Sequence, residues 1–177
     1  VERVADDFTR LCGSIGERGT ARMRYATTSS TAAAARSGVS TVDLAGLLAD
    51  SLEAHRAVDL RRGLTHVGPH RDDLELTLDG HQLRAFGSAG QQRTASIALR
   101  LLEAATLRGA GSAPLVLLDD PFAELDATRA ARILDLLETS GVAHQTILAV
   151  PRSDDIPREM TSLPRYRIVE GAIGEPR

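Results

Sequence analysis

The chain has 177 residues, of which 21 are basic and 24 are acidic, and its formal net charge is −3. All of the basic residues are arginine, since the sequence contains no lysine. A phosphate-binding loop of the form GxxxxGK[ST] uses its lysine to reach the β- and γ-phosphates, so this chain holds no complete loop of that kind. The small negative charge also gives no basic field that would by itself predict nucleic-acid binding.

The remaining composition indicates a globular protein with an aliphatic core. Aromatic residues make up only 3% of the chain and tryptophan is absent. The single cysteine, Cys12, excludes an intramolecular disulfide and fits a reducing cytosol. We expect it to be a small buried apolar group. No run of 18 apolar residues is present, so the sequence does not indicate a membrane span.

The first third of the chain predicts two helices and one strand. Apolar residues recur at helical spacing over 1–12, which indicates the end of an amphipathic helix. Residues 21–27 alternate and predict a short strand, whereas the small, polar residues 28–40 predict a loop or linker. A second helix is expected over about 41–62, with Gly63 ending it.

After Gly63 the pattern changes to alternating strands and helices. The expected elements are a strand at 64–68, a hairpin of 74–78 and 82–86, a helix at 89–108, a strand at 113–120, a helix at 127–139, a strand at 145–150 and a closing hairpin over 165–173. Asp79-Gly80 and Glu170-Gly171 supply the two hairpin turns. This order implies an α/β sheet flanked by helices, with a domain boundary near residue 63.

The most specific feature is the segment LVLLDDPFAELD at 115–126. Its apolar run predicts a fully buried strand, and ligands of α/β sheets bind where such strands end. Asp119 is placed there to bind Mg²⁺, directly or through water, and Asp120 to polarise an attacking water. The alternative is a buried strand whose final aspartates only cap a loop or a helix.

A second feature is the sequence SAGQQR, which opens the helix expected at 89–108. Ser88 is a good N-cap residue, and Gly90 lets a ligand approach the backbone closely. The first-turn N–H groups form an anion site, to which Gln91, Gln92 and Arg93 add side-chain donors. The alternative is an ordinarily capped helix with polar residues in its first turn.

The two features occur together in an order that is rarely repeated. This order resembles the signature helix, Walker B strand and D-loop of ABC-type ATPases, and more narrowly it resembles the RecF family of bacterial DNA replication and repair proteins. The resemblance covers roughly residues 41–173, and residues 1–40 match only loosely. The segments that carry it are Asp59–Gly63, Gly68–Asp73, Ser88–Arg93, Leu117–Asp120 and Glu124–Asp126.

The resemblance implies an α/β fold, namely an ABC-ATPase-like head of the P-loop NTPase superfamily that lacks its N-terminal P-loop part. Residues 1–62 would be the remnant of helical lobe II. Residues 63–177 would be the C-terminal part of the head, with its signature, Walker B and D-loop. Because the family's P-loop lies ahead of the helical lobe, we expect the chain to be the C-terminal half of a longer protein.

The resemblance also implies roles for individual residues. In such ATPases two heads hold two nucleotides between them, and the signature helix of one head contacts the nucleotide bound by the other. Asp119 would bind Mg²⁺, Asp120 would be the catalytic base that orients water, and Asp126 would be the D-loop residue that crosses the dimer interface. No switch residue is assigned after the strand at 145–150. The residues implied to contact the partner's nucleotide in trans are Ser88, Gly90, Gln91, Gln92 and Arg93.

Two interpretations of His70 and Arg71 stay open. In the first, Arg71 binds a phosphate or the DNA backbone, and His70 forms a hydrogen bond near the nucleotide. In the second, they lie in a tight Gly-Pro turn where Arg71 pairs with Asp72 or Asp73.

By resemblance, the intact protein would bind ATP, Mg²⁺ and DNA, would dimerise when ATP is bound, and would act at single-strand gaps. RecO- and RecR-type mediator proteins would be its partners, and its location would be cytoplasmic and associated with the nucleoid. The chain by itself is expected to be inactive. Two alternatives are the head of another SMC-like or nuclease-associated ATPase, and a nucleotide-independent module that binds protein or DNA.

Overall fold

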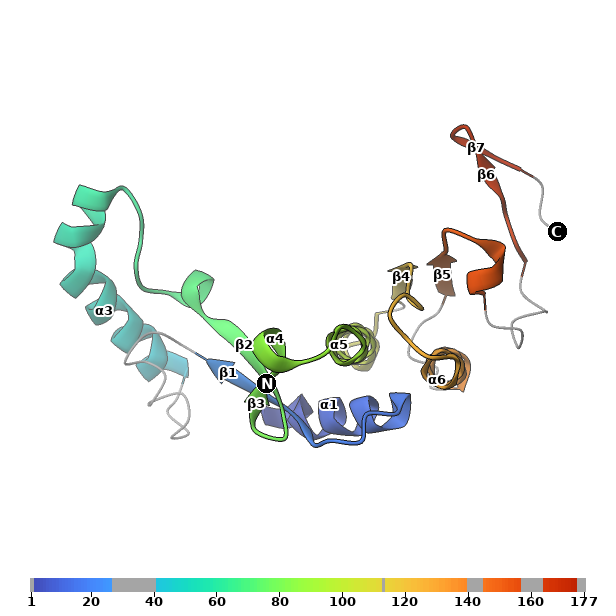
Figure 1. The fold of residues 1–177 in the computed structure, drawn as a ribbon. Helices are drawn as coiled ribbons and strands as arrows, with labels where there is room; N and C mark the ends of the chain where they lie inside the picture. The colour runs from blue at the N-terminus through green and yellow to red at the C-terminus, as the bar shows by residue number, and fades with distance from the viewer. Residues whose placement is uncertain (1, 27–40, 113, 140–144, 157–163, 175–177) are drawn as a thin grey trace. The chain divides into compact units, whose positions relative to one another are not determined.

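The computed structural model describes residues 2–26, 41–112, 114–139, 145–156 and 164–174. Their helices and strands are drawn in Figure 1, and they divide into two compact units. The first unit comprises Val1–Arg10 and Gly19–Gly87, and the second comprises Leu11–Arg18 and Ser88–Arg177. The boundary expected at residue 63 refers to the lobes of a longer head and stays a prediction. The linker expected at 28–40 lies outside the described residues.

Helix α1 (Glu2–Ile15) confirms the predicted amphipathic helix and extends it by one turn. Phe8, Cys12 and Ile15 have at most 1% of their surface exposed, and their spacing places them on one face of the helix. Cys12 is a free, buried thiol, as expected. Burial, together with the nearby negative charge of Glu17, raises the pKa of Cys12 to about 12.

The first unit contains a three-stranded antiparallel sheet in the order β1-β2-β3. Strand β1 (Ala21–Ala26) pairs with β2 (Asp73–Leu78), and β2 pairs with the short β3 (His81–Gln82). Asp79 and Gly80 both have positive φ, at 49° and 82°, which is the backbone of a type I′ hairpin turn. The predicted turn is therefore confirmed.

Two strands predicted in the first unit are wrong. Beyond Gln82 the expected return strand turns into helix α4 (Leu83–Phe86), which buries Leu83. The expected strand at 64–68 is irregular and leads into the 3₁₀ turn η1 (Pro69–Arg71). Gly68 has a φ of 135° and Pro69 lacks a backbone N–H, so this chain segment cannot continue a ladder of hydrogen bonds.

Helix α3 (Thr41–Arg62) has the predicted length and ends at Gly63, whose φ is 67°. None of the side chains described over residues 43–62 is buried, and Leu60 is 75% exposed. No helix in the described ranges is long and apolar enough to cross a membrane.

The second unit is built around two parallel strands, β4 (Leu115–Asp119) and β5 (Gln145–Ala149). Helices α5 (Ala89–Gly109) and α6 (Ala127–Thr139) pack with them. Val116 and Leu118 are buried, whereas Leu117 is 66% exposed. The strand predicted to be fully buried is therefore buried on one face only, because the described residues cover only that face.

The chain ends in short elements that agree with the predicted closing hairpin. After η2 (Ser153–Asp155), strands β6 (Ile168–Val169) and β7 (Ala172–Ile173) pair antiparallel. Glu170 and Gly171 form the turn with positive φ values. The described elements together make the mixed α/β fold expected from the sequence.

Candidate functional site

The N-terminus of helix α5 is capped by a capping box. The hydroxyl of Ser88 accepts a hydrogen bond from the Gln91 backbone N–H over 3.3 Å, and the Gln91 side-chain oxygen accepts one from the Ser88 N–H over 2.9 Å. The backbone N–H of Gln92 donates to the Ser88 carbonyl, and the Gln92 side chain is exposed. Ser88 and Gln91 thus order the first turn, whose positive dipole end favours an anion.

Gly90 provides a close approach between helix α5 and the loop that follows β4. A Cβ atom at Gly90 would lie 2.8 Å from the backbone oxygen of Glu124, closer than real Cβ atoms come to such an atom. Glu124 itself has a φ of 63°. The glycine of the predicted signature therefore packs against the predicted D-loop of the same chain.

The guanidinium group of Arg93 reaches the end of strand β4. Its Nη2 donates to the backbone oxygen of Asp119 over 2.9 Å and also to that of Asp120. Its Nε is buried and has no hydrogen-bond partner in the described part of the chain. The structure thus places Arg93 beside the two predicted catalytic-site aspartates, through their main chain.

Asp119 and Asp120 lie at the carboxyl end of β4, as predicted. Asp119 is the last residue of the strand and is exposed, and Asp120 is half-buried. The Asp120 N–H donates to the Ala149 carbonyl over 2.8 Å, so the ladder to β5 reaches this residue. Asp120 has a φ of 45°, in the left-handed region, which is uncommon for non-glycine residues, although Asp and Asn tolerate it best.

Asp126 is the N-cap of helix α6. Its carboxylate accepts a hydrogen bond from the Arg129 backbone N–H over 2.9 Å and lies 3.7 Å from the Arg129 Nε. That backbone hydrogen bond and the Arg129 charge hold the pKa of Asp126 below its ordinary value. The geometry gives Asp126 a local capping function, and its interface contact stays a prediction.

Arg129, which the sequence pattern does not indicate, connects three segments of the second unit. Its side chain donates to the Thr94 hydroxyl over 3.2 Å and to the Glu17 carboxylate over 3.4 Å. Thr94 is 1% exposed and is the one buried polar side chain of the described residues. Only the three-residue spacing of Arg129 from Asp126 could have indicated this position.

His70 and Arg71 belong to the first unit, unlike the other predicted site residues. The His70 Nε2 lies 3.0 Å from the Thr65 carbonyl, and the Arg71 Nε donates to the same oxygen over 3.1 Å. Within the described ranges, Arg71 makes no ion pair with Asp72 or Asp73. Both side chains are exposed, and their role stays a prediction.

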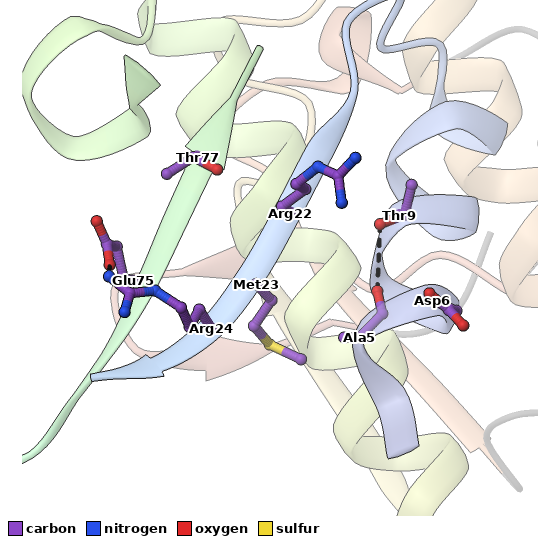
Figure 2. A pocket seen from close by; sticks show the side chains of 8 residues that line it. All are labelled: Ala5, Asp6, Thr9, Arg22, Met23, Arg24, Glu75 and Thr77. Atoms are coloured by element: carbon purple, nitrogen blue, oxygen red, sulfur yellow. Dashed lines mark hydrogen bonds and ion pairs between the residues drawn. The ribbon is translucent and has the colours of Figure 1, made fainter. Parts of the chain in front are cut away.

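The first unit also has an open cavity of about 320 Å³ between helix α1 and strands β1 and β2. Figure 2 shows Arg24 and Glu75 pointing toward one another at its edge, where they form an ion pair. None of the predicted site residues lines this cavity. Its lining residues are Ala5, Asp6, Thr9, Arg22, Met23, Arg24, Glu75 and Thr77.

No group of three or more His, Cys, Asp or Glu side chains that could hold a metal ion occurs in the described part of the chain.

After β5 the chain continues through Val150 and Pro151 to Arg152, whose Nε lies 3.4 Å from the Asp155 carboxylate. This arrangement does not identify a switch residue.

Comparison with curated proteins shows clear relatives, although no family model matches the chain. The DNA replication and repair protein RecF of Magnetococcus marinus is 44% identical over 123 residues, which cover 69% of this chain and 32% of the relative. RecF of Chloroflexus aurantiacus is 41% identical over 135 residues, covering 73% and 34%. This chain therefore spans about a third of the length of the curated relatives it matches.

Solved structures give the same family. The structure of the recombination mediator protein RecF-ATP in the RecFOR pathway matches 98% of this chain and 43% of that chain, with 25% identity and a TM-score of 0.69. The RecF-ATPrS form matches 98% and 44%, with 26% identity and a TM-score of 0.68. A structure of SMC ATPases, at 17% identity and a TM-score of 0.53, covers 98% of this chain and 81% of that one and shows a shared fold.

Proposed function

Because this chain belongs to the RecF family of DNA replication and repair proteins, we propose that it forms part of an ATPase head that binds ATP and DNA. The fold is that of RecF and SMC ATPase heads. In this proposal the chain supplies the signature helix, the Walker B strand and the D-loop. The phosphate-gripping lysine comes from sequence outside this chain, which contains no lysine.

The proposal rests on one observation: the start of helix α5 contacts the end of strand β4 and the loop that follows it. Arg93 bonds the Asp119 and Asp120 carbonyls, and Gly90 packs on the loop that follows them. An anion-binding helix start and a pair of carboxylates at a strand end are thereby built into one unit. Phosphoryl transfer depends mainly on positioning and electrostatics, and these groups supply both.

Asp119 and Asp120 have different roles in this proposal. The exposed Asp119 carboxylate is an oxygen ligand of the kind that Mg²⁺ prefers. Since Mg²⁺ keeps several waters and takes other oxygens from phosphates, one or two carboxylates suffice, which fits the absence of a larger ligand cluster among the described residues. Asp120, held in its left-handed conformation, would accept a proton from the attacking water and orient it.

The helix start would act on a nucleotide held by a second head. Ser88, Gly90, Gln91 and Gln92 would contact its γ-phosphate, because the first-turn N–H groups and the helix dipole favour an anion there. Asp126 would cross the interface between the two heads. Dimerisation would then depend on ATP.

The partners proposed for the intact protein are DNA at single-strand gaps and RecO- and RecR-type mediators. The related RecF structures are described as part of the RecFOR pathway, which supports the mediator partners. The exposed His70 and Arg71 are candidates for a phosphate or DNA contact. Such a contact would weaken as salt is added. A cytoplasmic, nucleoid-associated location would accompany this role.

The test uses the full-length protein encoded by the gene that contains this chain. We expect Mg²⁺-dependent ATP hydrolysis and ATP-dependent dimerisation, and Asp120→Asn should lower kcat by about 100-fold or more while ATP still binds. Asp135→Asn, a change at an exposed carboxylate of α6, is the matched control and should leave kcat unchanged. Undiminished hydrolysis by Asp120→Asn would refute the role of Asp120.

A further inference from the structure

Arg93 lies at the start of helix α5, where the sequence predicts that it faces a ligand, but its guanidinium contacts the backbone of its own chain. Its Nη2 donates to two consecutive carbonyls, those of Asp119 and Asp120. Its Nε is buried and unpartnered in the described residues. The guanidinium is therefore directed into its own chain, toward the end of β4.

The two carbonyls that Arg93 holds define the peptide groups on either side of Asp120. The φ of Asp120 is 45°, in the left-handed region that is uncommon outside glycine, although aspartate tolerates it better than most residues. Contacts that hold the neighbouring peptide groups therefore stabilise this conformation. On the other side, the Asp120 N–H is fixed by the Ala149 carbonyl at 2.8 Å. Together these contacts set the direction in which the Asp120 side chain leaves the backbone.

The same face of α5 makes two further contacts with the segment after β4. Gly90 lies one turn before Arg93 and touches the Glu124 backbone. Thr94 follows Arg93 and accepts a hydrogen bond from Arg129. Gln92, in contrast, is exposed at the helix start, so a ligand can reach one side of the helix start while the other side is bound to the Asp120 loop.

We infer that Arg93 is a positioning residue that acts in cis: it holds the Asp119–Asp120 backbone so that occupation of the α5 start by a partner's nucleotide is coupled to the placement of Asp120. This inference rests on the proposed ATPase function. It differs from the role expected from sequence, in which Arg93 contacts the nucleotide of the partner head. A guanidinium that already bonds two carbonyls of its own chain is better placed for the first role than for the second.

The two roles predict different kinetics in the full-length protein. With Arg93→Gln, the cis role predicts that kcat falls by about 10- to 100-fold, while KM for ATP changes by less than about twofold and ATP-dependent dimerisation persists. Arg93→Lys, which keeps the charge but loses the two-carbonyl geometry, should give an intermediate kcat. Arg100→Gln removes an exposed arginine that pairs with Glu103 on the same helix, and it should leave all three quantities unchanged. A raised KM with loss of dimerisation and unchanged kcat would overturn the inference.

A double-mutant cycle separates positioning from a general structural role. If Arg93 acts through Asp120, then Arg93→Gln should have no further effect on kcat in an Asp120→Asn background. An equal loss of kcat in both backgrounds would overturn the inference.

Amide hydrogen exchange tests the placement of Arg93 without nucleotide. In Arg93→Gln the Asp120 and Ala123 amides, which donate to Ala149 and Asp120, should exchange at least about tenfold faster, while amides in the middle of α6 stay unchanged. Absence of ATP hydrolysis by the unmodified protein would refute the proposed function, and unchanged exchange in the variant would refute the placement of Arg93.

Discussion

Arg129 of helix α6 donates a hydrogen bond to the hydroxyl of Thr94 in helix α5, over 3.2 Å and across 35 residues of sequence. Thr94 is almost fully buried, and the same guanidinium also reaches Glu17 and Asp126. A buried hydroxyl that accepts from a charged donor stabilises the fold more than an exposed one does. This pair therefore fixes α6 to α5 beside the predicted D-loop.

Replacing Thr94 tests the strength of this connection. Thr94→Val keeps the shape but removes the acceptor, so it should lower the free energy of unfolding by about 1–2 kcal/mol. Thr106→Val is the matched control, because the Thr106 hydroxyl donates to the Leu102 carbonyl within its own helix. That change should cost less than about 0.5 kcal/mol. Urea unfolding followed by circular dichroism measures both, and equal losses would contradict the prediction.

Gly90→Ala should separate α5 from the loop that follows β4. The new Cβ would lie 2.8 Å from the Glu124 carbonyl oxygen, and a backbone atom cannot move aside as a flexible side chain can. We expect a loss of about 1–3 kcal/mol in the free energy of unfolding. Gly109→Ala, at the other end of the same helix, meets open space and should be neutral or stabilising by up to about 1 kcal/mol. Equal stability of the two variants would show that the contact is not tight.

The capping carboxylate of Asp126 should make stability depend on pH. Its pKa is lowered in the folded chain, first by the Arg129 backbone hydrogen bond and then by the Arg129 charge. A lowered pKa means that the stabilisation is present above the unfolded value, near pH 4, and is lost as the pH falls through the folded value. Asp126→Asn retains a capping side chain, so it should remove this pH dependence and leave a helix cap. Unfolding midpoints between about pH 2 and 7 compare the two proteins, and identical pH profiles would rule out a contribution from Asp126.

The sequence predicts well those features that depend on neighbouring residues. The start of α5 is recognisable because Ser88 and Gln91 have capping-box spacing. The hairpin turns are recognisable because Asp79-Gly80 favours the positive φ values of a two-residue turn and Gly171 supplies a glycine at the second turn. The roles of Arg93 and Arg129 could not be predicted. The partners of Arg93 lie 26 and 27 residues away, and the partners Thr94 and Glu17 of Arg129 lie 35 and 112 residues away. Periodicity identifies a helix but does not identify what its polar side chains will meet.

The errors in strand prediction have equally local causes. Residues 64–68 are short and apolar enough for a strand, yet the Gly68-Pro69 pair that follows redirects the backbone. The continuous apolar run of β4 predicts burial on both faces, but Leu117 is exposed. An apolar pattern indicates which faces of a strand favour burial. It does not indicate whether the helix or strand that covers a face is part of this chain.

The absence of lysine allows a direct test of the proposal that this chain supplies the signature helix and the Walker B strand while the P-loop lies on sequence outside it. The 177-residue chain alone should show no saturable Mg·ATP binding by calorimetry and no turnover, because no side chain can act as the phosphate-gripping lysine of a P-loop. Adding the remaining part of the full-length protein as a separate polypeptide should restore ATP-dependent dimerisation. Robust ATP hydrolysis by the pure chain that is abolished by Asp120→Asn would contradict the proposal that the P-loop lies outside this chain. If both polypeptides are folded and dimerisation is not restored, the chain is better described as an interaction module that works without nucleotide.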